Sequence, residues 1–211
     1  YFVSLYFIIL FMCIQSRFWQ GLMITAVLTI LASCQKENNG GTPVSQKPKV
    51  GTTWTFSYYT YYSNGGVATS KTVTWKAISE ETLGGERWLR INELGVDTTV
   101  YLLREKSDGL YQYANNAANL FCKNPASLNE TYTSYNRDSM EVFQVLGAGI
   151  DLPTNIGDIK VNFYEGRRSG NLIDEIWFNA NAWIVRHQFY RKPPLGSYYK
   201  YSALFIRDIT Y

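Results

Sequence analysis

The stretch Thr53-Trp54-Thr55-Phe56-Ser57-Tyr58 decides the fold that the sequence predicts. Aromatic side chains occupy every second position, and small hydroxyl side chains lie between them. This period of two is typical of a β-strand with one buried face, because successive side chains of a strand point to opposite sides. A turn at Asn64-Gly65-Gly66 follows, since both residue types tolerate the positive φ of a tight hairpin. The chain then returns with Val73, Trp75 and Ala77 on one face, so the sequence opens on a β-hairpin with an aromatic inner face.

The same pattern continues through the first half of the chain. Glycine-containing turns separate three further segments with strand periodicity. With the first hairpin, these segments predict an antiparallel meander of five strands. The tyrosine pairs at 58–59 and 61–62 break strict alternation, which indicates a bulge or an edge exposed on both faces. The three added strands are expected at residues 87–93, 98–104 and 110–113, with turns at Gly84-Gly85, Gly95-Val96-Asp97 and Ser107-Asp108-Gly109.

The second half is less regular but ends in the same pattern. Residues 115–125 suggest a loop, and residues 147–157 suggest a connector that contains Pro153. Residues 140–146 fit a strand or a short helix. The other expected strands are residues 130–135, 159–164, 173–178, 183–190 and 198–209. About ten strands with few or no helices predict an all-β domain, either a sandwich or an open, curved (half-)barrel.

Composition supports one globular domain after a targeting segment. The chain has 211 residues, of which 46% are hydrophobic and 16% aromatic, enough to build a core. The net charge is +3, and no cluster of basic residues provides the footprint of a nucleic-acid partner. We therefore expect a single β-domain at residues 50–211 and no nucleic-acid partner.

The segment Leu31-Ala32-Ser33-Cys34 ends an apolar run that begins at Leu22. Arg17 supplies a positive charge before this run, and the run is shorter than the roughly 18 to 20 residues that span a bilayer as a helix. The segment resembles the lipobox of bacterial lipoproteins. The resemblance implies a signal peptide at residues 1–33 with its true start at Met12, and an N-terminal cysteine that carries diacylglycerol and a further acyl chain such as palmitate. More than one acyl chain is what stable anchoring requires.

Residues 34–49 hold glycine and proline and almost nothing apolar, so we expect a lipid-anchored tether. Its beginning, Gln35-Lys36-Glu37-Asn38, is similar to the signal that sends Bacteroidota lipoproteins to the outer face of the outer membrane. This resemblance favours display on the cell surface over the periplasmic face. Glu175-Ile176-Trp177-Phe178 followed by Trp183-Ile184-Val185-Arg186 resembles a hairpin of envelope lipoproteins, some of which have folds similar to the half-barrel of lipoprotein carriers. In that pattern a glycine stands where this chain has Trp183.

The sequence offers few groups for catalysis or metal binding. With Cys13 in the leader and Cys34 lipidated, Cys122 has no disulfide partner and is expected to be buried and inert. His187 is the one histidine, so a zinc site of histidines and cysteines is excluded by count, and we interpret His187 as a structural residue. The adjacent carboxylates Asp174-Glu175 and Glu80-Glu81 lie beside turns and are interpreted as solvated charges. We expect no catalytic residue, no metal and no cofactor.

Aromatic surplus is the remaining clue to function. Tyrosine combines a flat apolar face with a polar tip, which suits stacking on a glycan or gripping a protein. Tyr59, Tyr61 and Tyr62 are candidate ligand-binding residues because they violate alternation, although core packing also explains an aromatic strand. The leading hypothesis is a non-catalytic outer-membrane lipoprotein whose β-domain binds a ligand or partner, such as a glycan or an envelope protein. The alternatives are a half-barrel carrier that handles lipids or lipoproteins, and a cryptic glycan-active enzyme.

Overall fold

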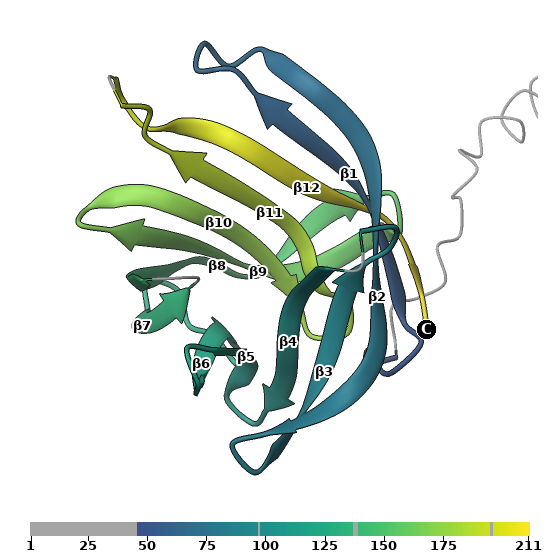
Figure 1. Cartoon of the computed structure of the whole chain (residues 1–211). Coiled ribbons are helices and arrows are strands. Elements are labelled where there is room, and N and C mark those ends of the chain that lie inside the picture. Colours follow the sequence, from purple (N-terminus) through teal and green to yellow (C-terminus); the bar gives the residue numbers. More distant parts are fainter. Residues whose placement is uncertain (1–45, 97, 137–138, 195) are drawn as a thin grey trace, which may run out of the picture. The chain divides into compact units, whose positions relative to one another are not determined.

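The computed structural model describes residues 46–211 apart from residues 97, 137–138 and 195 (Figure 1). The predicted signal peptide and the lipidation site at Cys34 lie outside these residues. The described chain is all-β, with twelve strands in one antiparallel sheet that curls into a nearly closed barrel. The strands are β1 Thr53–Tyr61, β2 Val67–Leu83, β3 Glu86–Glu93, β4 Thr98–Lys106, β5 Gly109–Ala114, β6 Ala117–Lys123, β7 Thr131–Asn136, β8 Ser139–Thr154, β9 Gly157–Arg168, β10 Asn171–Asn179, β11 Trp183–Arg191 and β12 Tyr199–Thr210.

The order across the sheet is β6-β5-β4-β3-β2-β1-β12-β11-β10-β9-β8-β7. Every neighbouring pair except β1–β12 joins strands that follow one another in the chain. This order confirms the meander, and the single curled sheet decides for the barrel rather than the sandwich. The predicted irregularity in the tyrosine-rich strand is a register shift between Thr60 and Tyr61 in the β1–β2 pairing.

Two predicted loops are strands in the structure. Residues 115–125 were expected to form a loop, but β5 and β6 form a hairpin with Asn115 and Asn116 at positive φ in its turn. A hairpin turn of this kind needs positive φ, which asparagine tolerates. The expected connector at 147–157 is the end of β8 and the start of β9, which bend through register shifts around Gly147 and Ile150. Both errors arose because glycine, proline and asparagine mark bulges and tight turns as well as loops.

The inner face of the barrel holds the aromatic core. Trp54 and Phe56 are almost fully buried, as the alternation predicts. Cross-strand partners share a face, so one row runs from Tyr164 through Ile176, His187 and Leu204 to Tyr58. The next row, on the opposite face, holds Phe163, Trp177, Arg186 and Phe205.

The barrel closes at a seam between β6 and β7, which lie next to each other without a shared strand ladder (Figure 1). Side chains bridge this seam. The Tyr132 hydroxyl donates to the Phe121 carbonyl at 2.9 Å, and the Tyr164 hydroxyl donates to the Lys123 carbonyl. Lys123 also pairs with Glu130 in the connector between the two strands. A few side-chain contacts therefore hold this seam together, whereas backbone hydrogen bonds of a strand ladder join every other pair of neighbouring strands.

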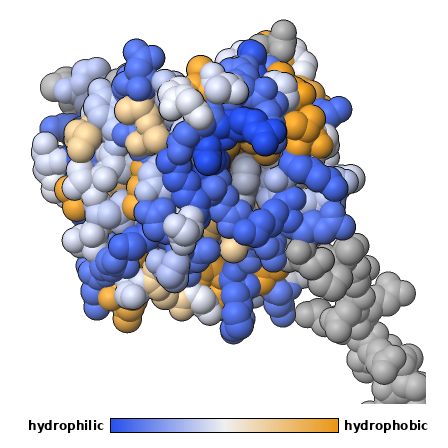
Figure 2. All heavy atoms as spheres, turned by 90° about the horizontal axis from the view of Figure 1, so that it is seen from below, coloured by the Kyte–Doolittle hydropathy of each residue, from blue (hydrophilic) through white to orange (hydrophobic). Residues whose placement is uncertain are grey.

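The outside of the barrel is mainly hydrophilic on the face seen from below, with hydrophobic residues in small scattered groups (Figure 2). Among the residues that the structure describes, no helix is long and apolar enough to cross a membrane.

Candidate functional site

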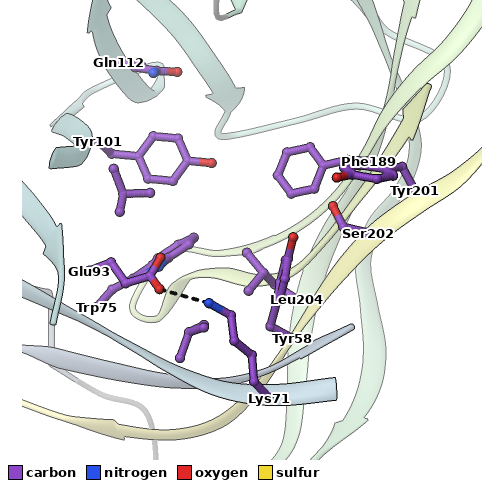
Figure 3. Close-up of a pocket in the computed structure, with 12 residues that line it drawn as sticks. Tyr58, Lys71, Trp75, Glu93, Tyr101, Gln112, Phe189, Tyr201, Ser202 and Leu204 are labelled. Atoms are coloured by element: carbon purple, nitrogen blue, oxygen red, sulfur yellow. Dashed lines mark hydrogen bonds and ion pairs between the residues drawn. The ribbon is translucent and has the colours of Figure 1, made fainter. Parts of the chain in front are cut away.

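A cavity of about 390 Å³ opens inside the barrel (Figure 3). Its walls come from β1 to β5 on one side and from β11 and β12 on the other. We call it the barrel cavity. The described residues that line it are Tyr58, Lys71, Val73, Trp75, Glu93, Val100, Tyr101, Gln112, Phe189, Tyr201, Ser202 and Leu204.

Aromatic rings form much of the cavity wall. Figure 3 shows Tyr101 and Phe189 facing each other across the open space, with Tyr58 rising from β1 below them. Tyr58 continues the alternation of Trp54 and Phe56, so the strand period itself delivers this ring to the inner face. Rings with polar tips on opposite walls make a slot that suits a flat or ring-shaped ligand with polar groups at its edge.

An ion pair gives one wall its charge. The Lys71 ammonium lies 3.5 Å from a Glu93 carboxylate oxygen (Figure 3), and 57% of the Lys71 side chain and 27% of the Glu93 side chain remain exposed. A partly exposed pair at this distance is worth little energy. Lys71 and Glu93 can therefore separate and bind polar groups of a ligand instead, at a small cost in free energy.

A buried histidine–aspartate pair lies beside the cavity, because Asp174 and His187 are register partners of the lining residues Phe189 and Leu204. His187 Nε2 is 3.0 Å from Asp174 Oδ1, and the side chains are 1% and 0% exposed. A carboxylate accepts, so Nε2 carries the proton, and His187 Nδ1 lies 3.4 Å from the Tyr101 hydroxyl. Tyr101 lines the cavity, so the pair is in contact with a polar residue of the cavity wall. The Phe189 ring, 3.8 Å from the imidazole between centroids, packs against the same histidine.

The interpretation of Asp174 as a solvated charge is wrong. In the strand, Asp174 has the same parity as Ile176, so it points inward. The parity of residues 173–178 was the signal that could have located it, but proximity to a turn was given more weight. Its neighbour Glu175 points to the other face and accepts a hydrogen bond from the Tyr190 hydroxyl at 2.7 Å. His187 is buried and packed against Phe189 in the barrel interior.

Below the cavity the barrel is filled. Trp54, Phe56 and Trp75 meet Trp183 and Ile184 there, with a space of only about 10 Å³ among them. Trp54 Nε1 donates to the Ala182 carbonyl at 2.8 Å, and the rings of Trp54 and Trp183 stack with centroids 6.1 Å apart. The cavity is thus a pocket with a solid floor.

The structure places the three candidate tyrosines away from this pocket. Tyr59 points to the outer face and meets Phe205 edge-on, with centroids 5.8 Å apart. Tyr61 lies under the Lys200 ammonium. Partial burial raises the pKa of the Tyr61 phenol, and the nearby Tyr59 raises it further. Tyr62 is 60% exposed at the β1–β2 turn. Tyr58, which the alternation places on the same face as Trp54 and Phe56, is the tyrosine of this segment that lines the cavity.

Cys122 is fully buried, as predicted, and burial raises the pKa of its thiol well above the ordinary value. No group of three histidine, cysteine, aspartate or glutamate side chains suited to a metal ion occurs among the described residues.

No known protein family matches this chain, and neither a curated protein nor a solved structure is similar to it.

Proposed function

We propose that the chain is a lipid-anchored, non-catalytic binding protein whose barrel cavity takes a small hydroxylated ring compound, with a carbohydrate as the leading candidate. The observation that carries the proposal is the composition of the cavity. Five of its lining residues are aromatic, and four more bring the polar groups of Lys71, Glu93, Gln112 and Ser202. A sugar offers apolar C–H faces to aromatic rings and hydroxyl groups to charged and amide side chains.

The size of the cavity supports a small ligand. Its volume of about 390 Å³ falls within the roughly 300–1,000 Å³ of small-molecule sites. The packed rings around Trp54 close the barrel below it, so a long extended molecule has no path through the interior. We infer that one or two sugar rings fill the site.

The lining argues against the two alternative functions. A lipid or lipoprotein carrier calls for an aliphatic groove, and three of the twelve described lining residues, Val73, Val100 and Leu204, are aliphatic. A glycosidase calls for two carboxyl groups on opposite sides of a cleft. Among the described lining residues, Glu93 is the one carboxylate.

Attachment through lipid on Cys34 remains part of the proposal and rests on the lipobox resemblance. We propose an outer-membrane location, with the surface-exposed side favoured. Mass spectrometry of the mature N-terminus tests this part, because an unmodified Cys34 within an intact leader contradicts it.

The binding site is tested with two neighbouring tyrosines that point to opposite faces of β1. The full-length chain is applied to a glycan array, and hits are titrated in solution by saturation-transfer NMR. We expect Tyr58→Ala to weaken binding by about tenfold or more, because it removes a stacking ring from the cavity. Tyr59→Ala is the matched control and should leave affinity within about twofold, as should Tyr61→Ala.

If Tyr59→Ala or Tyr61→Ala weakens binding and Tyr58→Ala does not, the ligand binds at the outer tyrosines, which contradicts the cavity assignment. A chain that binds no glycan on the array or in solution contradicts the proposed carbohydrate.

A further inference from the structure

Arg186 differs from the other arginines that the structure describes. Five of these arginines form ion pairs with glutamate. Two more, Arg191 and Arg207, lie within hydrogen-bond distance of a hydroxyl oxygen. Arg186 Nε is buried and has no hydrogen-bond partner, and no described carboxylate lies within ion-pair distance of its guanidinium. A partly buried cation without a contacting anion is an unusual and costly arrangement.

The guanidinium is held in place by two aromatic rings. Its Cζ lies 4.3 Å from the Trp177 ring centroid and 4.6 Å from the Phe205 ring centroid. Trp177 in turn stacks on Phe163 at 4.4 Å between centroids, with an interplanar angle of 12°. These residues are cross-strand neighbours on β9 to β12, so sheet register fixes the row. A planar cation stacked in this way is already oriented before any ligand arrives.

A second cavity of about 170 Å³ borders Arg186 on this face. The end of the β8–β9 hairpin, from Leu152 to Asn155, forms one wall, and Val185, Phe205 and Ile206 contribute to the other. Most of these side chains are apolar. Arg186 and Phe205 belong to the row opposite His187 and Leu204, so this cavity is separate from the barrel cavity.

Electrostatics agrees with this geometry. Partial burial lowers the pKa of Arg186, and attraction by Glu175, Tyr190 and Tyr61 offsets part of that effect. Glu175 accepts a hydrogen bond from Tyr190, and the nearby Asp151 pairs with Lys160 at 2.9 Å. These two carboxylates therefore have partners of their own, and Asp158, the register partner of Pro153, is a further carboxylate at this end of the hairpin.

We propose that Arg186 and the cavity beside it form a second binding site, on the outer face, for a small carboxylate with an apolar body, such as an aromatic or short-chain carboxylic acid. The carboxylate pairs with the outer nitrogens of the guanidinium, and the apolar body fills the space between Leu152, Pro153 and Phe205. This site does not depend on the proposed carbohydrate site.

The probes are benzoate and benzamide, which share a shape and differ in charge. The full-length chain is labelled with 5-fluorotryptophan, and the ¹⁹F resonance of Trp177, assigned with Trp177→Phe, reports on the site. We expect benzoate to shift this resonance saturably and to bind at least about tenfold more tightly than benzamide, since a charged hydrogen bond is lost with the amide. Inorganic phosphate should bind more weakly than benzoate, because it has no apolar body.

Arg186→Gln should reduce benzoate affinity about tenfold, and Arg186→Lys should reduce it less, because lysine keeps the charge without the planar fork. Arg207→Gln is the matched control on β12 and should leave benzoate binding unchanged, as should Tyr58→Ala in the barrel cavity. If Arg186→Gln does not fold, Arg186→Lys decides, and full benzoate affinity in that variant overturns the proposal. Equal binding of benzamide, equal binding of phosphate, or no saturable shift with benzoate also overturns it.

Discussion

Trp183 has a left-handed backbone, with φ at 63°. A bulky residue rarely adopts this conformation, because its Cβ is crowded. A glycine would adopt this backbone without strain. Here the indole compensates by packing on Trp54, and it is 4% exposed. Its Nε1 is buried without a hydrogen-bond partner, whereas Trp54 Nε1 donates to Ala182.

The two stacked tryptophans should therefore respond differently to phenylalanine. Trp54→Phe removes packing and leaves the Ala182 carbonyl without its donor, so we expect a loss of about 2–3 kcal/mol in the free energy of unfolding. Trp183→Phe removes packing but also an unpaired buried donor, so we expect a loss of roughly 1 kcal/mol. Urea denaturation measures both, and an equal or larger loss for Trp183→Phe contradicts the role given to its Nε1.

At the scale of elements, the sequence predicted the regular strands and missed the irregular ones. The hairpins of the first half and the pair β10–β11 follow from alternation and glycine turns, which are local signals. The β5–β6 hairpin was missed because Asn115-Asn116 forms its turn within a stretch rich in alanine and asparagine, which have low strand propensity. Tertiary pairing with β5 overrides that propensity. Asp174 was misjudged for a different reason, since it lies beside a turn but shares the inward alternation of Ile176.

Gly109 tests the β5–β6 hairpin. Its φ is 149°, and a Cβ there would lie 2.3 Å from the Cys122 carbonyl oxygen of the neighbouring strand. We expect Gly109→Ala to separate the strands and lower the free energy of unfolding by roughly 2–4 kcal/mol. Gly85 is the matched control, because its φ is 79° but no atom lies within 4 Å of the added Cβ. Gly85→Ala should cost about 1 kcal/mol, from backbone strain alone. Similar losses in the two variants, measured by urea denaturation, contradict a steric role for Gly109.

At the scale of the whole molecule, the barrel cavity could not be predicted from the sequence. Alternation places Tyr58 on an inner face, but the opposite wall comes from β11 and β12 at the other end of the chain. The two walls meet because β1 pairs with β12, and no local sequence pattern indicates that pairing. The Arg186 site is equally non-local, since its row spans β9 to β12 and its cavity needs the bent end of β8.

The seam between β6 and β7 predicts how the whole barrel responds to alkaline pH. Burial is the main cause that raises the pKa of Tyr132 and Tyr164 above the ordinary value near 10, and interaction with Cys122 raises it further. A group whose folded pKa is raised stabilises the fold below its unfolded pKa, and that contribution is lost as the pH rises toward the folded value. We expect stability to change little up to about pH 9.5 and to fall above about pH 10.

Tyr132→Phe separates the seam from other tyrosines. It should lower stability by about 1 kcal/mol at neutral pH, because the bond to the Phe121 carbonyl is lost, and make the decline above pH 10 shallower. Urea denaturation at several pH values measures both effects. Tyr62→Phe, at an exposed turn, should reproduce neither. A Tyr132→Phe variant whose alkaline decline matches the unmodified chain contradicts the assignment.

The order of strands in the sheet also affects the order in which the barrel folds. All hairpins form between segments adjacent in the chain, and only the β1–β12 pairing among the described strands brings together residues as far apart as Thr53 and Thr210. We expect the closing of that single long loop to be the slow, entropically costly step, whereas each six-stranded half forms from pairs of neighbouring strands. A circular permutant, with the neighbouring ends of β1 and β12 joined and the chain reopened between β6 and β7, would keep every ladder and make each of them local.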